Sequence, residues 1–457
     1  MKAIDGLANH CTNLAVAVGN GPHVFCYDNI NLSTSDFVEQ RGSATPAKVT
    51  SGTFPILYKV CNGTADDMKL APILERLRKC KGLEFNGDLR PTIAQMTSFQ
   101  SQLQVVVVRV LTKYCKDFEE YALLETLQHI PQRPLPKGHK TEQFPLRIAT
   151  IEEASIQGNL QLHDEVYINQ LKQTSERLST LAIPSFNDQL TNSRIRSAQI
   201  IRAQDVDSWE RREVFQLGFG LFHLCLNLIW AYLHIHRGSL SQVGSLTYYF
   251  ALLDKTRLGG EHPDYHTLLS ALVQIHDGIL LHAWRVECAP SNLSQFAKTK
   301  PTAATLLQYA GNIIRDYAMP LTTGETENEN EEEGESDVET MPIPTTNANQ
   351  PSRGRGQQRT LPAETIDLPN PDRDRVHQNT RILLRDLLYL SELIQAISDG
   401  DIGRIEAFLP QLAMMFRGAG GNNYCTEILH FIVNLKHVWT ENFAWVLLLQ
   451  LRARCRN

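Results

Sequence analysis

Two aspartates, Asp28 and Asp188, each follow an apolar run that predicts a buried β-strand, His23–Tyr27 and Leu181–Phe186. In α/β sheets, ligands and catalytic groups gather at the carboxyl ends of the strands. If these two strands are neighbours, the two carboxylates converge there. Two close carboxylates repel each other, and one shifts toward its protonated form unless a cation lies nearby. Mg²⁺ takes oxygen ligands and keeps several waters, so it is the cation that this pair favours.

A third carboxylate beside this pair would complete a two-metal site, in which one ion activates the attacking oxygen and the other stabilises the leaving oxygen. The plain alternative is a turn at the end of each strand, because Asp and Asn side chains commonly bond to nearby backbone N–H groups. Asp28 is followed by Asn29, and Asp188 is preceded by Asn187. Both interpretations are open for each aspartate.

Three further side chains are candidates for roles beside these acids. His223 lies in the most apolar stretch, residues 217–235, where a histidine is more often part of the core than a ligand. Arg194 and Arg196 belong to a basic segment with a helical pattern, residues 193–203. They could contact phosphate, although a solvated helix face is the commoner meaning of such charges.

Several enzyme classes lose support because their motifs do not occur in the sequence. There is no G-x-G-x-x-G or G-x-x-x-x-G-K-[ST] loop for a nucleotide cofactor, and no G-x-S-x-G or H-E-x-x-H. The nine cysteines form no C-x-x-C or C-x-x-H pair, so neither a disulfide scaffold nor a structural zinc site is expected. Reduced thiols suit an intracellular compartment.

The formal net charge of −6 over 457 residues comes from one short segment. Residues 325–339 read ETENENEEEGESDVE, with nine acids and no base, and the rest of the chain carries +3. This balance excludes a protein that coats nucleic acid with a uniformly basic surface. It leaves open a site that binds DNA through a local patch and metal ions. The apolar stretch 217–235 is interrupted by two histidines and an asparagine, so no membrane span is expected.

The predicted elements are strands, then helices, then strands, then many helices. A helix over 1–19 precedes two strands, 23–32 and 53–60, which could form a hairpin with a long loop. A helical pattern dominates 67–130, although Val105–Val108 also suit a strand. The remaining expectations are a linker over 131–140, helices over 150–180, a strand over 181–186, a strand or helix start over 214–222, and helices over 245–320 and 373–457. This order predicts an α+β fold with an α/β core, mostly helical overall.

Composition divides the chain into three parts. Residues 321–375 contain the acidic run and then a stretch rich in Pro, Gly and polar residues, which predicts a disordered linker. Residues 1–320 would hold the sheet with a large helical insertion. Residues 376–457 would form a helical part that packs back on that core.

Five segments of the sequence resemble a known family. In order they are Tyr27–Asn31 (YDNIN), Asn187–Arg196 (NDQLTNSRIR), Gly220–His223 (GLFH), His262–Leu272 (HPDYHTLLSAL) and Gly418–Leu429 (GAGGNNYCTEIL). Together they resemble the large fungal family catalogued as domain of unknown function 6589, over roughly residues 10–445. That family is functionally uncharacterised, so the resemblance implies relatives without implying an activity.

A broader resemblance, to eukaryotic cut-and-paste transposases, implies a fold and a chemistry. Those proteins have an RNase H-like mixed sheet, a large helical insertion and a D-D-E triad. The first acid ends the first strand, the second ends the fourth strand, and the third lies on a late helix. The resemblance implies catalytic and Mg²⁺-binding roles for Asp28, Asp188 and Glu427, with Glu392 and Glu441 as weaker candidates for the third acid.

The same resemblance assigns a place to His223. Many of these transposases carry Cys or Asp, two residues and then His downstream of the second acid, and residues 220–223 match that position with Gly220 instead of Cys or Asp. Asn187 also departs from the pattern, because the family is expected to have Gly before its second acid.

Two functions are consistent with these residues. The first is a transposon-derived, RNase H-like protein of the nucleus that cuts and joins DNA by in-line phosphoryl transfer, with Mg²⁺ at the acids if the site is active. The second is a domesticated or truncated relic without enzymatic activity, a scaffold that binds another protein through the linker 321–375. Neither function involves a membrane or a nucleotide cofactor. Binding of a divalent cation separates the two, because only the first requires it.

Overall fold

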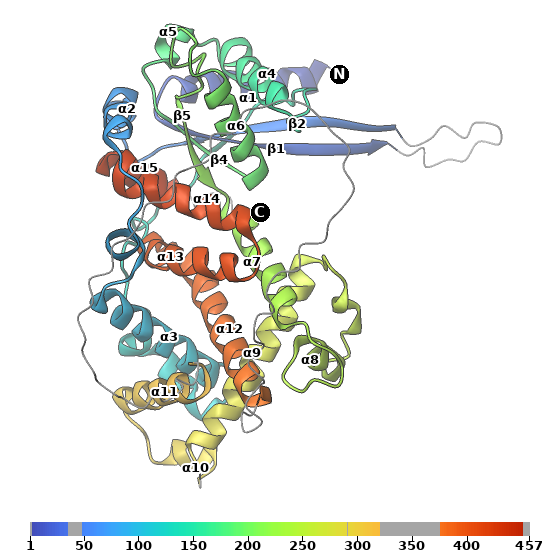
Figure 1. The fold of residues 1–457 in the computed structure, drawn as a ribbon, viewed down its shortest axis with the longest axis vertical. Coiled ribbons are helices and arrows are strands. Elements are labelled where there is room, and N and C mark those ends of the chain that lie inside the picture. Colours follow the sequence, from blue (N-terminus) through green and yellow to red (C-terminus); the bar gives the residue numbers. More distant parts are fainter. Residues whose placement is uncertain (1, 35–47, 290, 320–374, 451–457) are drawn as a thin grey trace, which may run out of the picture.

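The computed structural model of the chain describes residues 2–34, 48–289, 291–319 and 375–450. In these residues one mixed sheet, with helices around it, forms one end of the molecule, and helices build the other end (Figure 1). The predicted α+β class, mostly helical overall, is therefore confirmed. The predicted linker 321–375 lies outside the described residues except for Arg375, with which a helix begins.

The sheet contains five strands of the described residues, in the order β3-β2-β1-β4-β5. Their bounds are β1 (His23–Thr34), β2 (Lys48–Lys59), β3 (Gln143–Pro145), β4 (Ile183–Asn187) and β5 (Phe215–Phe219). β2 is antiparallel to β1 and to β3, whereas β4 is parallel to β1 and to β5. The two N-terminal strands form the expected hairpin, which extends beyond the rest of the sheet in Figure 1.

The two strands β4 and β5 form the buried side of the sheet. Every residue of both strands is buried, as is usual where helices cover both faces of a parallel pair. The segment 214–222, for which a strand and a helix start were both open, contains both elements. β5 ends at Phe219, Gly220 occupies the N-cap, and α7 (Leu221–His236) follows.

Helices pack around the sheet and also form a separate layer at its end (Figure 1). Those near the sheet are α1 (Lys2–Gly19), α2 (Leu70–Lys79), α4 (Ile156–Asp164), α5 (Ser175–Leu178), α6 (Gln189–Ile201), α14 (Asn422–Val433) and α15 (Glu441–Gln450). Those in the helical end are α3 (Ile93–Tyr114), α8 (Leu246–Leu252), α9 (Tyr265–Glu287), α10 (Leu293–Lys298), α11 (Ala303–Tyr317), α12 (Arg375–Asp399) and α13 (Ile402–Gly418).

Short helical turns connect these elements. They are η1 (Phe85–Leu89), η2 (Lys116–Leu123), η3 (Glu125–Leu127), η4 (Glu165–Gln170), η5 (Thr256–Gly259) and η6 (Asn434–Val438). η6 continues directly from α14, so one nearly continuous helical segment runs from residue 422 to residue 438.

Aromatic side chains join the sheet to helices from distant parts of the sequence. Phe25 of β1 contacts Tyr167 of η4, with ring centroids 5.4 Å apart. Phe219 of β5 contacts Phe431 of α14, with ring centroids 4.8 Å apart. Edge-on and tilted ring pairs of this kind add about 0.5–1.5 kcal/mol each beyond the area that they bury. The division of the chain into parts 1–320 and 376–457 remains a prediction, but α14 of the second part packs directly on β5 and α6 of the first.

Buried polar contacts fix the helical end. Arg404 of α13 makes a two-pronged ion pair with Glu392 of α12, with both N–O distances 2.8 Å. The indole of Trp284 in α9 donates to the backbone carbonyl of Val107 in α3 at 3.1 Å. The four valines Val105–Val108, which also suited a strand, therefore lie in a helix and are buried by its neighbours. No helix in the described part of the chain is long and apolar enough to cross a bilayer.

Candidate functional site

The strands that carry Asp28 and Asp188 are direct neighbours in the sheet. β1 and β4 run parallel, with Phe25 opposite Ser185. Asp28 and Asp188 each lie three residues beyond those partners, so they occupy matching positions where β4 ends. Adjacent strands are about 4.8 Å apart. The two strands are therefore neighbours, as convergence of the two carboxylates requires.

Both aspartates also accept hydrogen bonds from nearby backbone N–H groups, but only Asp188 follows a strand end. β1 continues through Asp28 to Thr34, paired with β2, so the expectation that this strand ends near Asp28 is wrong. Asp188 is the N-cap of α6, and its Oδ1 accepts a hydrogen bond from the N–H of Thr191 at 2.7 Å. Asp28 accepts one from the N–H of Asn29 at 2.9 Å. These bonds orient the two side chains, and each bond occupies only the Oδ1 oxygen of its carboxylate. Oδ2 of Asp188 makes no hydrogen bond with the described residues, and the side chain of Asp28 is 54% exposed.

Glu153 is the acid that joins this pair, and sequence reasoning missed it. It lies in the loop before α4 and is only 3% exposed. Burial, reinforced by the charges of Asp28 and Asp188, raises its pKa from 4.5 to about 8. Thr191 Oγ1 donates to its Oε2 at 3.4 Å. Three carboxylates from three separate segments thus act on one another at the edge where β4 ends.

A chain of hydrogen bonds fixes the loop that carries Glu153. The hydroxyl of Tyr27 donates to Oδ1 of Asn159 at 2.6 Å, and Nδ2 of Asn159 donates to the carbonyl of Glu153 at 2.7 Å. Burial raises the pKa of Tyr27 well above its usual value, and the charges of Glu153 and Asp188 add to this effect. The phenol is therefore a stable donor, and β1 sets the position of the loop. Arg194, one of the two arginines considered for phosphate contact, also donates to the backbone carbonyl of Glu153, at 3.3 Å.

Glu427, the expected third acid, has a different partner. Its carboxylate is buried and accepts hydrogen bonds from Arg196 of α6, at 2.5 and 3.2 Å, and from Nδ2 of Asn192, at 2.7 Å. A buried carboxylate needs such a cation, because desolvation of an unpaired charge is costly. Glu427 and Arg196 join α14 to α6, and the side chain of Arg196, which is 23% exposed, is bound to this carboxylate. The catalytic role of Glu427 and the phosphate contact of Arg196 remain predictions.

The two weaker candidates for the third acid lie elsewhere. Glu392 is the partner of Arg404 in the helical end. Glu441 is exposed in the first turn of α15. Among the described residues, neither makes a hydrogen bond or ion pair with Asp28 or Asp188.

His223 lies beside Asp28 rather than in the apolar core. Its Nε2 is 3.7 Å from Oδ2 of Asp28, and its side chain is 25% exposed. It belongs to the first turn of α7, directly after β5. The turn is held from the other side by Asn227, whose Nδ2 donates to the carbonyl of His223 and to the hydroxyl of Tyr424, both at 2.9 Å. The imidazole and the carboxylate of Asp28 are thus close neighbours at the end of the sheet where β4 ends.

The acids do not form a finished metal site. Within the described ranges, no three His, Cys, Asp or Glu side chains lie close enough together to bind one metal ion. Asp28, Asp188 and Glu153 nevertheless provide only oxygen donors, which is the ligand type of Mg²⁺. Their mutual repulsion is visible in the raised pKa of Glu153, and a divalent cation would relieve it. The donor chemistry fits a hard divalent ion that keeps several of its waters.

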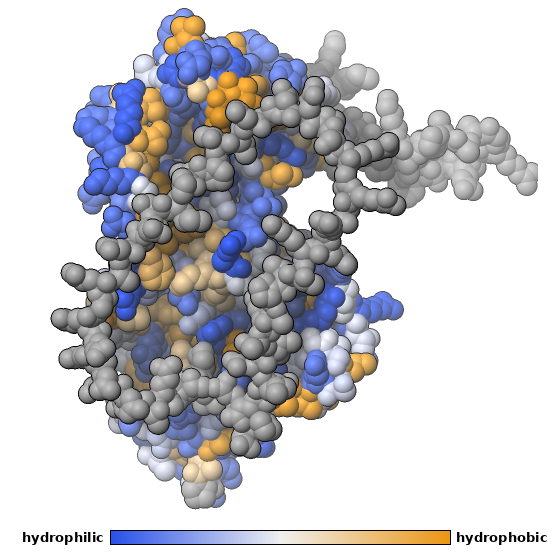
Figure 2. Space-filling view, viewed as in Figure 1, coloured by the Kyte–Doolittle hydropathy of each residue, from blue (hydrophilic) through white to orange (hydrophobic). Residues whose placement is uncertain are grey.

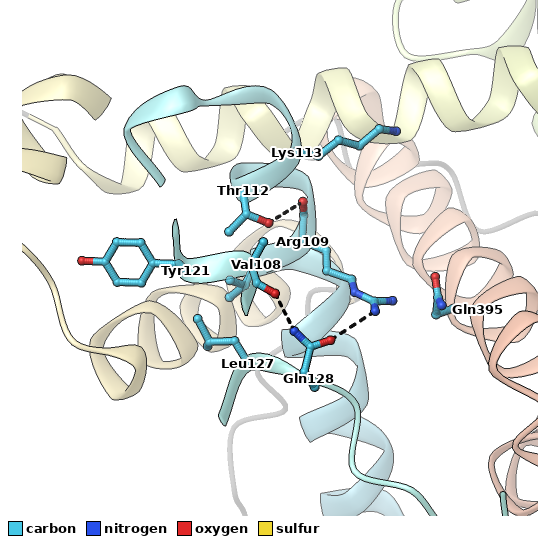
Figure 3. Close-up of a pocket in the computed structure, with 9 residues that line it drawn as sticks. Val108, Arg109, Thr112, Lys113, Tyr121, Leu127, Gln128 and Gln395 are labelled. Atoms are coloured by element: carbon cyan, nitrogen blue, oxygen red, sulfur yellow. Dashed lines mark hydrogen bonds between the residues drawn. The ribbon is translucent and has the colours of Figure 1, made fainter. Parts of the chain in front are cut away.

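A separate pocket in the helical end has no such chemistry. It has a volume of about 360 Å³ and lies among α3, η2, η3 and α12 (Figure 3). Figure 3 shows the guanidinium of Arg109 between Gln128 and Gln395, while Lys113 and Tyr121 point away from it. The lining contains no carboxylate, so the acids at the end of β4 remain the candidate site.

A comparison with known protein families identifies the family of this chain. Residues 78–451 match the family of unknown function DUF6589. The chain belongs to this family. The match begins in α2 rather than near residue 10, so within DUF6589 the shared region includes Glu153, Asp188, His223 and Glu427, whereas Asp28 precedes it. No curated protein and no solved structure matches the chain.

Proposed function

We propose that this chain is a transposon-derived protein with an RNase H-like domain that cleaves or joins DNA strands at a site built from Asp28, Asp188 and Glu153. One observation carries the proposal. The acids of the first and fourth strands lie at matching positions of two adjacent parallel strands, in a sheet of order β3-β2-β1-β4-β5 in which only β2 runs against the others. This is the arrangement that the resemblance to D-D-E transposases implies.

Glu153 takes the role of third carboxylate in this proposal, in place of Glu427. Its raised pKa has Asp28 and Asp188 among its causes, whereas Glu427 is already neutralised by Arg196. Asp28, Asp188 and Glu153 would bind Mg²⁺. When bound, the ion would activate the attacking oxygen and stabilise charge on the leaving oxygen.

The protein's own side chains orient and supply protons around the scissile phosphate. Asp188, capped onto α6, and Asp28, exposed on β1, face the substrate from two adjacent strands. Attack by a water or hydroxyl oxygen forms a new P–O bond, the P–O3′ bond breaks, and the leaving oxygen takes up a proton. His223 lies beside Asp28 and is the side chain of this site best suited to carry that proton.

The test is nicking of supercoiled plasmid by the full chain in Mg²⁺, compared for Asp28→Asn, Asp188→Asn and a control, Asp117→Asn. Asp117 is an exposed acid of η2 in the helical end. Loss of a ligand should reduce the rate by about 100-fold or more, since even outer-shell partners of a metal typically contribute 10–100-fold. The control should be unchanged. Equal nicking by Asp28→Asn and the wild type would refute the proposal, and so would nicking that persists in excess EDTA.

A further inference from the structure

A basic hollow of about 490 Å³ lies between α2 and η6, away from the acids. Its lining is four cations, Arg76, Lys79, Lys81 and Lys436, with His437, Cys80, two glycines and the two acids Glu84 and Asp88. Arg78 lies within the same turn of α2 as Arg76 and Lys79. In Figure 2 the surface over α2, at the upper left, is largely hydrophilic. The hollow therefore carries an excess of positive charge on an open surface.

Asp88 is already bound from within the protein. It accepts hydrogen bonds from the backbone N–H of Glu84 at 2.8 Å and from Nε2 of His437 at 3.0 Å. The N–H bond from Glu84 is the largest cause of its lowered pKa, so the carboxylate stays charged. Lys436 donates to the backbone carbonyl of the same residue. Asp88 thus orients Lys436 and His437 from one side of the hollow.

Several cations on the other side have no internal carboxylate partner. Lys81 lines the hollow and is exposed, and its side chain makes no hydrogen bond or ion pair within the described ranges. Arg76 donates through Nε to the carbonyl of Val438 at 3.1 Å, which leaves its terminal nitrogens available. Lys79 pairs with Glu75, but both side chains are more than half exposed, and such a pair is weak. These cations are available to an external anion.

One helical segment connects this hollow to the acids of the sheet. Tyr424, in the first turn of α14, accepts a hydrogen bond from Asn227, which also donates to the carbonyl of His223 beside Asp28, so that end of the helix lies near the proposed site. Lys436 lies twelve residues further along α14 and η6. At 1.5 Å per residue the separation is about 18 Å along the axis. A nucleic-acid duplex advances 3.4 Å per base pair, so about five pairs cover this distance.

We propose that the basic hollow binds the phosphate backbone of duplex DNA whose neighbouring segment reaches Asp28 and Asp188. This proposal takes its ligand, DNA, from the function proposed above, and it therefore rests on that function. Duplex DNA carries one negative charge per about 1.7 Å of axis, so it can meet several of these cations within one short groove. Contacts of this kind set position and affinity without reading sequence. The hollow supplies a local basic patch, which the nearly neutral composition of the chain does not exclude.

The experiment measures binding of a fluorescein-labelled 24-base-pair duplex to the full chain by anisotropy, in EDTA and at several salt concentrations. The variant is Lys79→Gln/Lys81→Gln, which removes two lysines that line the hollow. The matched control is Lys116→Gln/Lys298→Gln, two exposed lysines of η2 and α10. These two elements pack against each other, and Figure 1 shows α10 at the opposite end of the molecule from α2. Loss of two phosphate contacts should make the slope of log K against log salt less negative by about 1.8, and should weaken binding roughly 10- to 60-fold at 0.1 M salt. The control should bind like the wild type.

Three results would overturn the proposal: an unchanged slope in the variant, an equal loss in the control, or tighter binding of a single-stranded RNA through the same two residues. A urea midpoint equal to the wild type shows that the variant is folded. Because the assay excludes metal, it is independent of cleavage. If the slope changes while Asp28→Asn nicks normally, the hollow is a DNA-binding surface and the proposed nuclease function fails. If nicking depends on Asp28 but the slope does not change, the hollow is not the binding surface.

Discussion

Replacement of Glu153 by Gln should make the protein more stable at alkaline pH. The carboxyl of Glu153 is buried and has its pKa raised from 4.5 to about 8, mainly by burial and further by Asp28 and Asp188. In the folded state the neutral form is therefore favoured. The glutamine side chain has nearly the same shape and carries no charge at any pH. The substitution removes the cost of ionising this site and keeps an oxygen that can accept from Thr191.

The magnitude follows from linkage. Between pH 4.5 and 8 the folded protein binds more protons than the unfolded chain, so stability that is fully present below pH 4.5 is lost as the pH rises through 8. A shift of one pKa unit corresponds to about 1.36 kcal/mol. The cost is therefore about 3 kcal/mol at pH 7 and about 5 kcal/mol above pH 8, as an order of magnitude. Glu153→Gln should recover most of it at pH 8.5 and almost none at pH 4.

The assay is urea unfolding followed by tryptophan fluorescence between pH 4 and 9, for the wild type, Glu153→Gln and the control Glu152→Gln. Glu152 is the exposed neighbour in the same loop, so it shares the sequence context without the burial. The difference in unfolding free energy between wild type and Glu153→Gln should grow with pH. The control should follow the wild type.

Mg²⁺ provides a second arm of the same experiment. In the wild type at pH 8, an ion that binds only the folded state should add about 2.7 kcal/mol at a concentration 100 times its Kd. It should also lower the pH at which Glu153 ionises, because a nearby cation favours the charged form. A parallel pH dependence of wild type and Glu153→Gln would refute the argument about burial and repulsion. Equal stabilisation of both by Mg²⁺ would refute the role of Glu153 as a ligand.

Two further predictions concern the support of the site. Arg196→Met should reduce the free energy of unfolding by about 3–5 kcal/mol, because it leaves Glu427 buried without a cation; a loss below 1 kcal/mol in urea titration would show that the pair is not needed. Gly158→Ala should cost about 1–3 kcal/mol or more, since its Cβ would lie 2.0 Å from the carbonyl of Glu152. It should also weaken Mg²⁺ stabilisation by displacing the neighbouring Glu153, and unchanged calorimetric Mg²⁺ binding would contradict this.

Local patterns predicted the elements at the sheet edge well. The apolar runs before Asp28 and Asp188 both lie in strands, and a buried strand needs only neighbouring residues to be recognised. The end of β1 was not predicted, because pairing with β2 extends this strand past Asp28 to Thr34. Val105–Val108 show the limit of that method, because four valines suit both a strand and a buried helix face. The structure shows that they belong to α3, where neighbouring elements bury them and the indole of Trp284 in α9 donates to the backbone carbonyl of Val107.

No local pattern marked Glu153. Glu152 and Glu153 precede Ser155, the N-cap of α4, and acids are common at the start of a helix because of its dipole. The pair therefore looks like an ordinary solvated helix start. Burial and the charges of two distant strands make one of them unusual, and neither can be read from its neighbours in sequence. The same reasoning explains Glu427, whose distant partner Arg196 was not predicted.

The sequence by itself determined the α+β class, the hairpin and the strand that ends just before Asp188, because these depend on residues within a few positions of one another. It did not determine where β1 ends, because the pairing of β1 with β2 continues past Asp28 to Thr34. Tertiary structure alone decided which acids meet. Residues 28, 153 and 188 are brought together by the parallel pairing of β1 with β4 and by the hydrogen bonds from Tyr27 through Asn159. The same long-range packing pairs Glu427 with Arg196 instead. Burial and Coulomb interactions depend on distance in space, and chain order does not set that distance.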